Sequence, residues 1–283
     1  MPARRETNKD GFDRSHLNID LQLRYGTLHR DYIAHCFRWT YAVKHFKTNS
    51  HLRKQDRNIL DIGCGRDVPL FVAMAANQGD FNHYYGVDLG KIEYPKNREG
   101  SKLQRTILEN TNILDLSTKE LPDVNAVVSF EVFEHMPARY VSKVINHSID
   151  ISSNKAEFIF STPCWDPKVG AAKNHPNEMT REAFGYLLEE CGLEIVKNFG
   201  TFASLKDYKH HLTEEELSVF SKMAEYYDVT MLSTMLAPLY PQYSRNNLWV
   251  LRKADNFSTR YFPNKPETQW ASGPDWKELL CTY

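Results

Sequence analysis

Short apolar runs alternate along the chain with segments in which apolar residues recur every three or four positions. The short runs have the length of strands, and the spaced segments have the periodicity of helices that bury one face. Strands that are apolar along their whole length are typical of a parallel sheet covered by helices on both faces. The pattern predicts seven strands, at residues 58–62, 83–88, 104–108, 124–130, 157–161, 193–197 and 247–251.

Helical periodicity marks the segments between and around these strands. A helical segment at 17–47 precedes the first strand, and Gly192 stands where a helix C-cap places glycine. An unusually long helical stretch is predicted over 213–239, and its apolar residues Leu217, Phe220, Met223 and Tyr227 would share one face. Shorter helices are expected between strands at 68–76, 141–151 and 180–191.

This order of elements predicts an α/β fold class: a Rossmann-like, seven-stranded, mostly parallel sheet flanked by helices. The expected layout is a tail and helical extension at 1–57, a sheet domain at 58–253 with a helical insertion at about 204–243, and an irregular tail at 254–283.

Composition and charge exclude several classes of protein. Hydrophobic residues make up 41% and charged residues 25% of the 283 positions, the balance of an ordinary globular protein. The 35 Lys and Arg nearly equal the 36 Asp and Glu, so the formal net charge of −1 creates no general field that attracts nucleic acid or an anionic membrane. The five cysteines contain no Cys-x-x-Cys pair, no signal-peptide core opens the chain, and no apolar run has bilayer-spanning length. We therefore expect a cytoplasmic protein without a membrane segment.

The first predicted strand ends in a glycine turn, Leu60-Asp61-Ile62-Gly63-Cys64-Gly65. Glycine lets a ligand approach the backbone closely, and parallel sheets bind ligands at the carboxyl edge. A carboxylate, Asp88, ends the second strand 88 − 65 = 23 residues after the turn, where it can bind both hydroxyls of a ribose. Dinucleotide-binding proteins share these features, but their third glycine would fall at Val68, and Asp61 adds a carboxylate ahead of the turn. The combination favours an aminoacyl nucleoside over NAD.

Three segments together resemble the class I S-adenosylmethionine-dependent methyltransferases. The glycine turn is similar to the first motif of that family, residues 86–88 to the second, and residues 121–129 to the strand that leads to the catalytic edge. The likeness covers roughly residues 58 to 200. It implies that the glycine turn surrounds the methionine moiety, that Asp88 binds the ribose, and that residues 112–113 lie at the adenine. The predicted cofactor-binding set is Asp61, Gly63, Cys64, Gly65, Asp88, Leu89, Asn112, Ile113 and Phe130.

The chain departs from this pattern at three places. Asp67 stands where the family often has a third glycine, and Asn112 stands where it usually has an acidic residue. The segment at 91–101 is short and interrupted by proline where the family has a full helix. These departures keep a non-catalytic S-adenosylmethionine-binding protein open as an alternative.

Candidate catalytic residues follow the fourth predicted strand. Glu131 and Glu134 are three positions apart and His135 follows directly, so their side chains can converge on one point. Two carboxylates and an imidazole can bind Mg²⁺ or Mn²⁺, and a metal or a general base assists methyl transfer when the acceptor is a reluctant hydroxyl. The string also resembles two metal-dependent branches, the ubiquinone-biosynthesis O-methyltransferases and the small-RNA 2′-O-methyltransferases. That resemblance implies a further histidine after the fifth strand, here His175, so the predicted catalytic and metal-binding set is Glu131, Glu134, His135 and His175.

A second interpretation of these four residues stays open. A Glu-His pair at this place is common in small-molecule methyltransferases that use no metal, and carboxylates near a helix N-terminus are favoured by the helix dipole. His175 could equally be an ordinary loop histidine. In either case we expect Glu134 and His135 near the active site.

The resemblance implies a methyltransferase that acts on a hydroxyl, or alternatively on a nitrogen, of a small molecule or nucleotide, with or without a metal. An RNA 2′-O-methyltransferase is the alternative, and the neutral net charge disfavours it. The segment with Arg24, Tyr25, His29, Arg30 and Tyr32 is interpreted as a lid over the cofactor or as a scaffold helix. The insertion before the last strand is interpreted as an acceptor-binding element or a dimer surface, and the oligomeric state stays open.

Overall fold

The computed structural model describes residues 30–93, 102–254, 260–264 and 271–272. Seven strands form one sheet in the order β3-β2-β1-β4-β5-β7-β6, which confirms the predicted Rossmann-like α/β class. The strands are β1 Asn58–Ile62, β2 His83–Val87, β3 Gln104–Leu108, β4 Ala126–Phe130, β5 Glu157–Pro163, β6 Leu193–Phe202 and β7 Asn246–Lys253.

The strands β1 to β4 end at nearly the same level of the sheet. All pairings among β1 to β5 are parallel, and Ile62 at the end of β1 is paired with both Val87 and Ser129. Val87 is paired in turn with Leu108. The residues that follow these strands therefore lie side by side along one edge of the sheet, the carboxyl edge.

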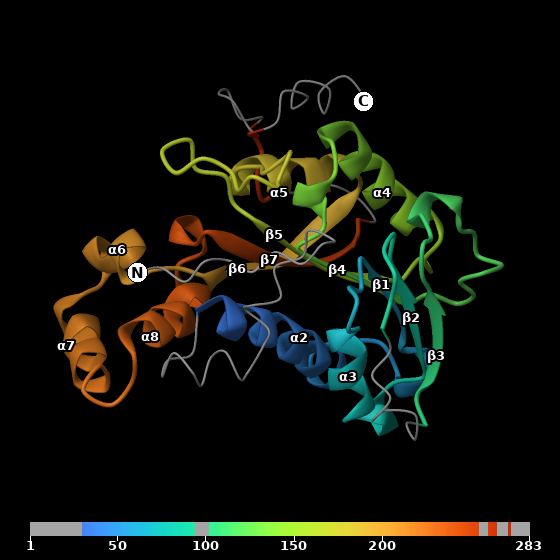
Figure 1. Cartoon of the computed structure of the whole chain (residues 1–283), viewed down its shortest axis with the longest axis horizontal. Coiled ribbons are helices and arrows are strands. Elements are labelled where there is room, and N and C mark those ends of the chain that lie inside the picture. Colours follow the sequence, from blue (N-terminus) through green and yellow to red (C-terminus); the bar gives the residue numbers. More distant parts are fainter. Residues whose placement is uncertain (1–29, 94–101, 255–259, 265–270, 273–283) are drawn as a thin grey trace. The chain divides into compact units, whose positions relative to one another are not determined.

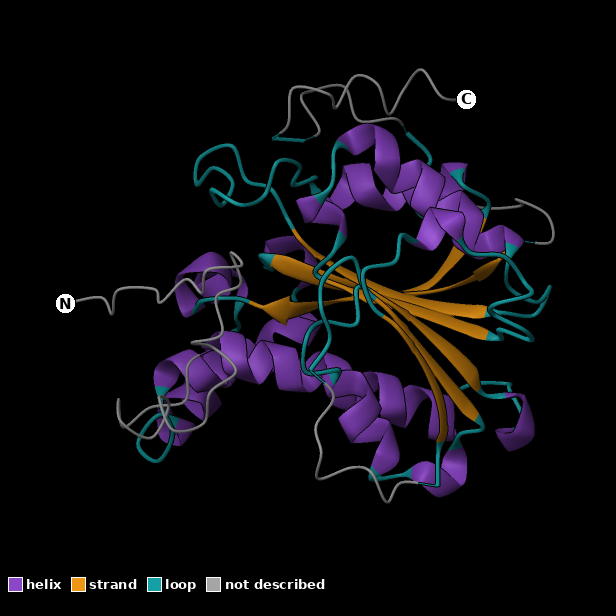
Figure 2. Ribbon diagram, turned by 45° about the vertical axis from the view of Figure 1, so that its right-hand side comes forward, coloured by secondary structure: helices purple, strands orange, loops and turns teal. Residues whose placement is uncertain are grey.

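Helices cover both faces of this part of the sheet (Figures 1 and 2). α4, Ala138–Asp150, and α5, Arg181–Glu190, lie on one face, whereas α3, Pro69–Ala75, and the second half of α2, Arg30–Thr48, lie on the other. β1 and β5 are buried along their whole length, including their polar residues such as Asp61 and Glu157. α5 begins at a Thr180 cap whose hydroxyl accepts the Ala183 N–H, and Gly192 follows its end with a φ of +86°.

The chain forms two compact units. The larger one comprises residues 39–198 and 248–283, and it contains the strands β1 to β5 with their helices. The smaller one comprises residues 1–38 and 199–247, and it contains the helical insertion. Among the described residues, no helix is both long and apolar enough to cross a membrane.

The helical stretch predicted over 213–239 is present, but it is divided into separate helices. The insertion contains three helices: α6 Leu205–Tyr208, α7 Glu214–Met223 and α8 Val229–Leu236. α8 starts afresh because the Asp228 carboxylate accepts the N–H groups of Thr230 and Met231. Tyr227 lies between the helices and is 51% exposed, and Met223 is 39% exposed, so neither belongs to a buried face. At the N-terminus, α2 is described only from Arg30, so the predicted start of that helix and the side chains of Arg24, Tyr25 and His29 lie outside the described residues.

Candidate functional site

The predicted site residues all lie in the larger unit, near the carboxyl ends of β1 and β4 or on the loops that follow β1 to β5 at the carboxyl edge. The glycine turn after β1 is held to the end of β2, because the N–H groups of Gly63 and Cys64 donate to the Val87 carbonyl at 2.8 and 3.2 Å. Gly63 and Gly65 both have left-handed backbones, with φ of +69° and +72°.

The two glycines of this turn serve different purposes. A Cβ atom on Gly63 would lie 2.3 Å from Cγ2 of Val132, so Gly63 lets the turn pack directly against the segment after β4. A Cβ atom on Gly65 would meet nothing within 4 Å, so open space borders the backbone there. Gly65 is therefore the position where a ligand can approach the turn.

Asp88 connects the glycine turn with the loop after β3. Its carboxylate accepts the Gly65 N–H at 2.9 Å and the Gly90 N–H at 2.7 Å. Its carbonyl accepts the Thr111 N–H at 2.9 Å, which places residues 112–113 next in line along the edge. The structure therefore brings together the three segments in which the cofactor-binding residues were predicted.

Asp61 lies under the turn and is 3% exposed. Burial raises the pKa of its carboxyl to about 7, and the charge of Asp88 adds to the rise, while a hydrogen bond from the Tyr84 hydroxyl at 2.7 Å opposes it. Burial also raises the pKa of the Cys64 thiol. Asp61 is thus a buried acid that lacks a cationic neighbour among the described residues.

The other predicted cofactor residues are placed unequally. Leu89 is 74% exposed, Phe130 is half-buried, and Ile113 is buried in the core. Asn112 is exposed, and its side-chain oxygen accepts the Leu114 N–H as the cap of a short 3₁₀ turn. This capping hydrogen bond explains the presence of an asparagine at position 112 without any contact to a cofactor.

Glu131 differs from the other three predicted catalytic residues. Its φ of +57° is left-handed, a strained conformation for a residue other than glycine. Its backbone N–H donates to the Ser161 carbonyl at 3.0 Å, and its carboxylate accepts the Ser161 hydroxyl at 2.9 Å. Glu131 is thereby tied to β5 and does not join the cluster described next.

Glu134, His135 and His175 converge. Each offers one possible ligand atom, and these three atoms lie within 4.8 Å of one another. Glu134 is 1% exposed, and its carboxylate lies 3.9 Å from Nε2 of His135. The two imidazole rings meet edge to face, with centroids 4.8 Å apart. We call these three residues the carboxyl-edge cluster.

The hydrogen bonds of both histidines fix which nitrogen holds the proton. Nδ1 of His135 lies 3.0 Å from the Asn174 carbonyl, which can only accept, so Nδ1 is the donor and Nε2 keeps its lone pair. Nδ1 of His175 lies 2.5 Å from the Glu178 carboxylate and donates to it in the same way. Burial lowers the pKa of His135, and the neighbouring His175 adds to this, while the Asn174 carbonyl opposes it. The cluster therefore presents imidazole lone pairs beside a buried carboxylate, a set of atoms that could hold a metal ion.

Two residues of this site were missed by the sequence analysis. Glu178 binds His175, and the spacing of three residues between them was a signal that could have found it. Asn177 is 1% exposed, and its N–H donates to the Glu134 carbonyl at 3.3 Å. Neither atom of its side-chain amide has a hydrogen-bond partner among the described residues. Buried amides in that state are costly unless a ligand or water binds them.

A family model described as a methyltransferase domain matches residues 37–198, more than half of the chain. The chain belongs to the methyltransferase-domain family. It is an S-adenosylmethionine-dependent methyltransferase of class I, as its resemblance predicted. No curated protein sequence matches the chain.

Solved structures of other methyltransferases are similar to this one. A SAM-dependent methyltransferase from Archaeoglobus fulgidus is 16% identical, with 83% of this chain and 99% of that chain covered and a TM-score of 0.47. A chain of the Haloferax volcanii complex between the Trm112 methyltransferase activator and a putative methyltransferase is 14% identical, with 87% and 99% covered and a TM-score of 0.47. Geranyl diphosphate C-methyltransferase from Streptomyces coelicolor is 15% identical, with 77% of each chain covered and a TM-score of 0.45.

Proposed function

We propose that this methyltransferase transfers the methyl group of S-adenosylmethionine to a hydroxyl oxygen of a small molecule or nucleotide, with a divalent metal ion held by Glu134, His135 and His175. The observation that supports this most is the convergence of these three side chains within 4.8 Å. Both histidines direct their N–H groups to other acceptors, which leaves lone pairs for a cation.

The cofactor fits the first half of the carboxyl edge. The open space at Gly65 admits a ligand to the turn, and the half-buried Asp88 carboxylate has lone pairs left for ribose hydroxyls after accepting two N–H groups. The Asp61 carboxylate can neutralise the positive charge of the amino group of the methionine moiety, because a nearby cation lowers the pKa of a buried carboxyl. When bound, the cofactor supplies an electrophilic methyl group.

The acceptor belongs beside the carboxyl-edge cluster. Gly63 packs against Val132, so the glycine turn directly adjoins the segment that bears Glu134 and His135. Methyl transfer is an in-line displacement, and holding the two reactants on adjacent loops provides most of the alignment that it needs. The unpartnered, buried Asn177 amide beside Glu134 is a further group that a bound ligand would satisfy.

The donor set restricts the metal. Two imidazole nitrogens and one carboxylate suit Mn²⁺ or another transition metal better than Mg²⁺, which prefers oxygen ligands throughout. Such an ion supplies Lewis acidity that makes a hydroxyl more acidic. We assign Glu131, whose carboxylate accepts the Ser161 hydroxyl just after β4, as the general base that accepts the hydroxyl proton.

The test is a methyl-transfer assay on a panel of acceptors, read by mass spectrometry for the gain of one methyl group. The panel pairs small-molecule alcohols, phenols and nucleotides with an RNA oligonucleotide and its DNA counterpart, which lacks the 2′-hydroxyl. We expect methylation of a small molecule or nucleotide that stops in chelator and returns with Mn²⁺. Full turnover in chelator would reduce the three residues to lining of the acceptor site. Methylation of the RNA alone, lost in the DNA control, would replace the small acceptor by RNA.

A further inference from the structure

A distant part of the chain lies directly on the loop that bears His175. The Glu178 N–H donates to the Ser272 hydroxyl at 2.8 Å, and the Ser272 N–H donates back to the Glu178 carbonyl at 2.8 Å. The neighbouring residues Met179 and Ala271 form an antiparallel bridge. Ala271 is fully buried, so this contact belongs to the packed interior of the larger unit.

The opposite side of Met179 is also fixed. It forms a parallel bridge with Cys164, just past the end of β5, and its carbonyl accepts the Trp165 N–H at 2.9 Å. The backbone around Met179 is therefore held between the continuation of β5 and residues 271–272. This clamp comes one residue after Glu178 and four after His175.

The Glu178 side chain connects this fixed backbone to the His175 ring. Its carboxylate is 8% exposed and accepts both Nδ1 of His175 at 2.5 Å and the Ala172 N–H at 3.1 Å. A carboxylate that accepts the Nδ1–H of an imidazole sets the tautomer and orientation of the ring, and increases the basicity of Nε2. Partners of this kind are characteristic of histidines that bind metal ions.

We propose that Glu178 and Ser272 are positioning residues of the metal site. Ser272 fixes the backbone of Glu178, and Glu178 fixes the His175 ring with its lone pair available to a metal ion. The inference rests on the proposed metal-assisted function and adds to it Ser272, which lies 94 positions after Glu178 in the sequence.

The experiment measures Mn²⁺ affinity of the full chain by calorimetry and by electron paramagnetic resonance, without cofactor or turnover. Glu178→Ala is expected to weaken Mn²⁺ binding by about 10- to 100-fold, the usual cost of losing an outer-shell partner. Glu178→Gln keeps an acceptor oxygen and should lose less. Ser272→Ala removes a single hydrogen bond and should cost about two- to tenfold.

Glu189→Gln is the matched control. Glu189 is 2% exposed and accepts the backbone N–H groups of Tyr261 and Phe262, so it also holds the C-terminal segment, but it is not bonded to a histidine. A merely structural role for Glu178 would make the two glutamine variants alike in Mn²⁺ affinity.

The outcomes separate the two proposals. Wild-type protein that binds no Mn²⁺ overturns the metal-assisted function and this inference with it. Wild-type protein that binds Mn²⁺, with the Glu178 and Ser272 variants binding equally well, overturns the inference alone. Should Glu178→Ala fail to fold, as judged by circular dichroism, the Glu178→Gln and Ser272→Ala variants decide the question.

Discussion

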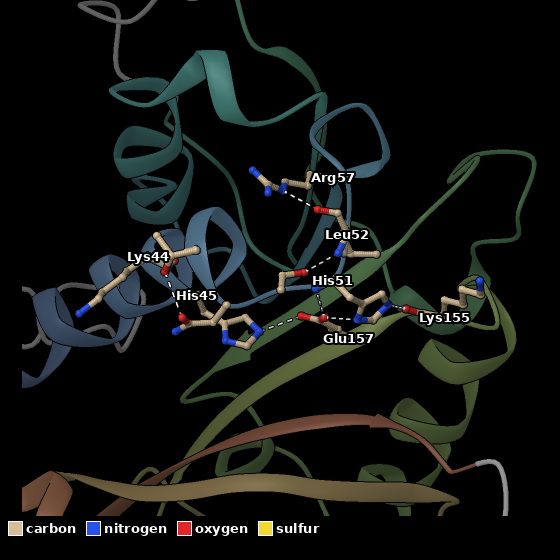
Figure 3. Close-up of polar contacts among 10 residues, drawn as sticks. Lys44, His45, His51, Leu52, Arg57, Lys155 and Glu157 are labelled. Atoms are coloured by element: carbon tan, nitrogen blue, oxygen red, sulfur yellow. Dashed lines mark hydrogen bonds and ion pairs between the residues drawn. The ribbon is translucent and has the colours of Figure 1, made fainter.

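Among the residues of the larger unit that the structure describes, two clusters of one glutamate and two histidines lie at opposite edges of the sheet. Besides the carboxyl-edge cluster, Glu157 at the start of β5 lies between His45 of α2 and His51 (Figure 3). Here the histidines bind the carboxylate itself, with Nε2 of His45 at 2.7 Å and Nδ1 of His51 at 2.5 Å. We call this the amino-edge cluster.

The difference between the clusters lies in where the imidazole N–H groups point. At the amino edge, Nε2 of His45 and both Nδ1 and the backbone N–H of His51 face the Glu157 carboxylate, while Nε2 of His51 faces the Lys155 carbonyl. The ring nitrogens that contact Glu157 thus tie α2 and residue 51 to the start of β5. At the carboxyl edge the N–H groups of His135 and His175 face away from Glu134, toward Asn174 and Glu178. Lone pairs beside a carboxylate repel one another until a cation separates them. The same three residue types thus build a structural tie in one place and a candidate metal site in the other.

The largest expected effect is on the carboxyl-edge cluster. His175→Ala should reduce turnover by at least about 100-fold, since a ligand contributes no less than its outer-shell partners do. The melting temperature should fall as well, because the buried Glu178 carboxylate loses its imidazole partner, so turnover is measured at a temperature where the variant is folded. His45→Ala is the control and should keep its turnover at temperatures where it is folded. Equal turnover losses in the two variants would contradict the assignment of the carboxyl-edge cluster to the active site and of the amino-edge cluster to a structural role.

The next effect is on stability and concerns the amino edge. Glu157→Ala should lower the free energy of unfolding by about 2 kcal/mol, toward the low side for a broken buried ion pair because His51 is half exposed. Urea denaturation measures this loss, and S-adenosylmethionine binding by the folded variant should be unchanged. A stability unaffected by the substitution would show that the hydrogen bonds of the cluster contribute nothing net.

A third prediction compares Glu157 with Asp61, a buried carboxylate that lacks a histidine. The pKa of Asp61 is about 7 in the free protein, so below pH 7 a cationic cofactor group must displace a proton. Affinity for S-adenosylmethionine should therefore fall by up to about tenfold per pH unit below pH 7 and level off above it. Calorimetry in two buffers of different ionisation enthalpy measures both the affinity and the released proton. Asp61→Asn should abolish the dependence, and a flat wild-type profile would contradict the predicted contact with the methionine moiety.

The smallest expected effect is on the way folding stability decreases at acidic pH. Burial alone would raise the pKa of Glu157, but hydrogen bonds and charge from His45, together with the His51 N–H, bring it below its usual value of 4.5. A carboxyl whose pKa is lower in the folded state contributes stability above 4.5 that is lost as the pH falls through the folded pKa. The unfolding midpoint of the wild type should thus drop more steeply below about pH 5 than that of Glu157→Gln. If the unfolding midpoints of the two proteins changed with pH in parallel, the predicted lowering of the Glu157 pKa by folding would be contradicted.

The strands and the cofactor edge were predictable because they depend on short-range signals. Burial on both faces makes the central strand β4 and much of β1 and β5 apolar, and parallel register then brings Gly65 and Asp88 together. The break inside the helical insertion was missed because the apolar spacing continues past Met223, while the Asp228 side chain starts a new helix. A capping carboxylate leaves little trace in a periodic pattern.

The parts that escaped prediction depend on long-range pairs. Glu157 meets His45 across 112 positions, and Glu178 meets Ser272 across 94. No periodicity joins residues so far apart, and only the folded backbone decides which acceptor each imidazole faces. Glu131 shows the same limit, because its bond to Ser161 could not be read from its spacing to Glu134.

The bridge between Met179 and Ala271 also affects the order in which parts of the site form during protein synthesis. A ribosome that has just added Glu178 must add 94 more residues before Ser272 exists. At about 5–20 residues per second, the His175 loop waits on the order of 5–20 seconds for the segment that clamps it. At the proposed metal site, a nascent chain that has folded its sheet but does not yet contain Ser272 would thus hold a metal ion more weakly than a chain in which the clamp has formed.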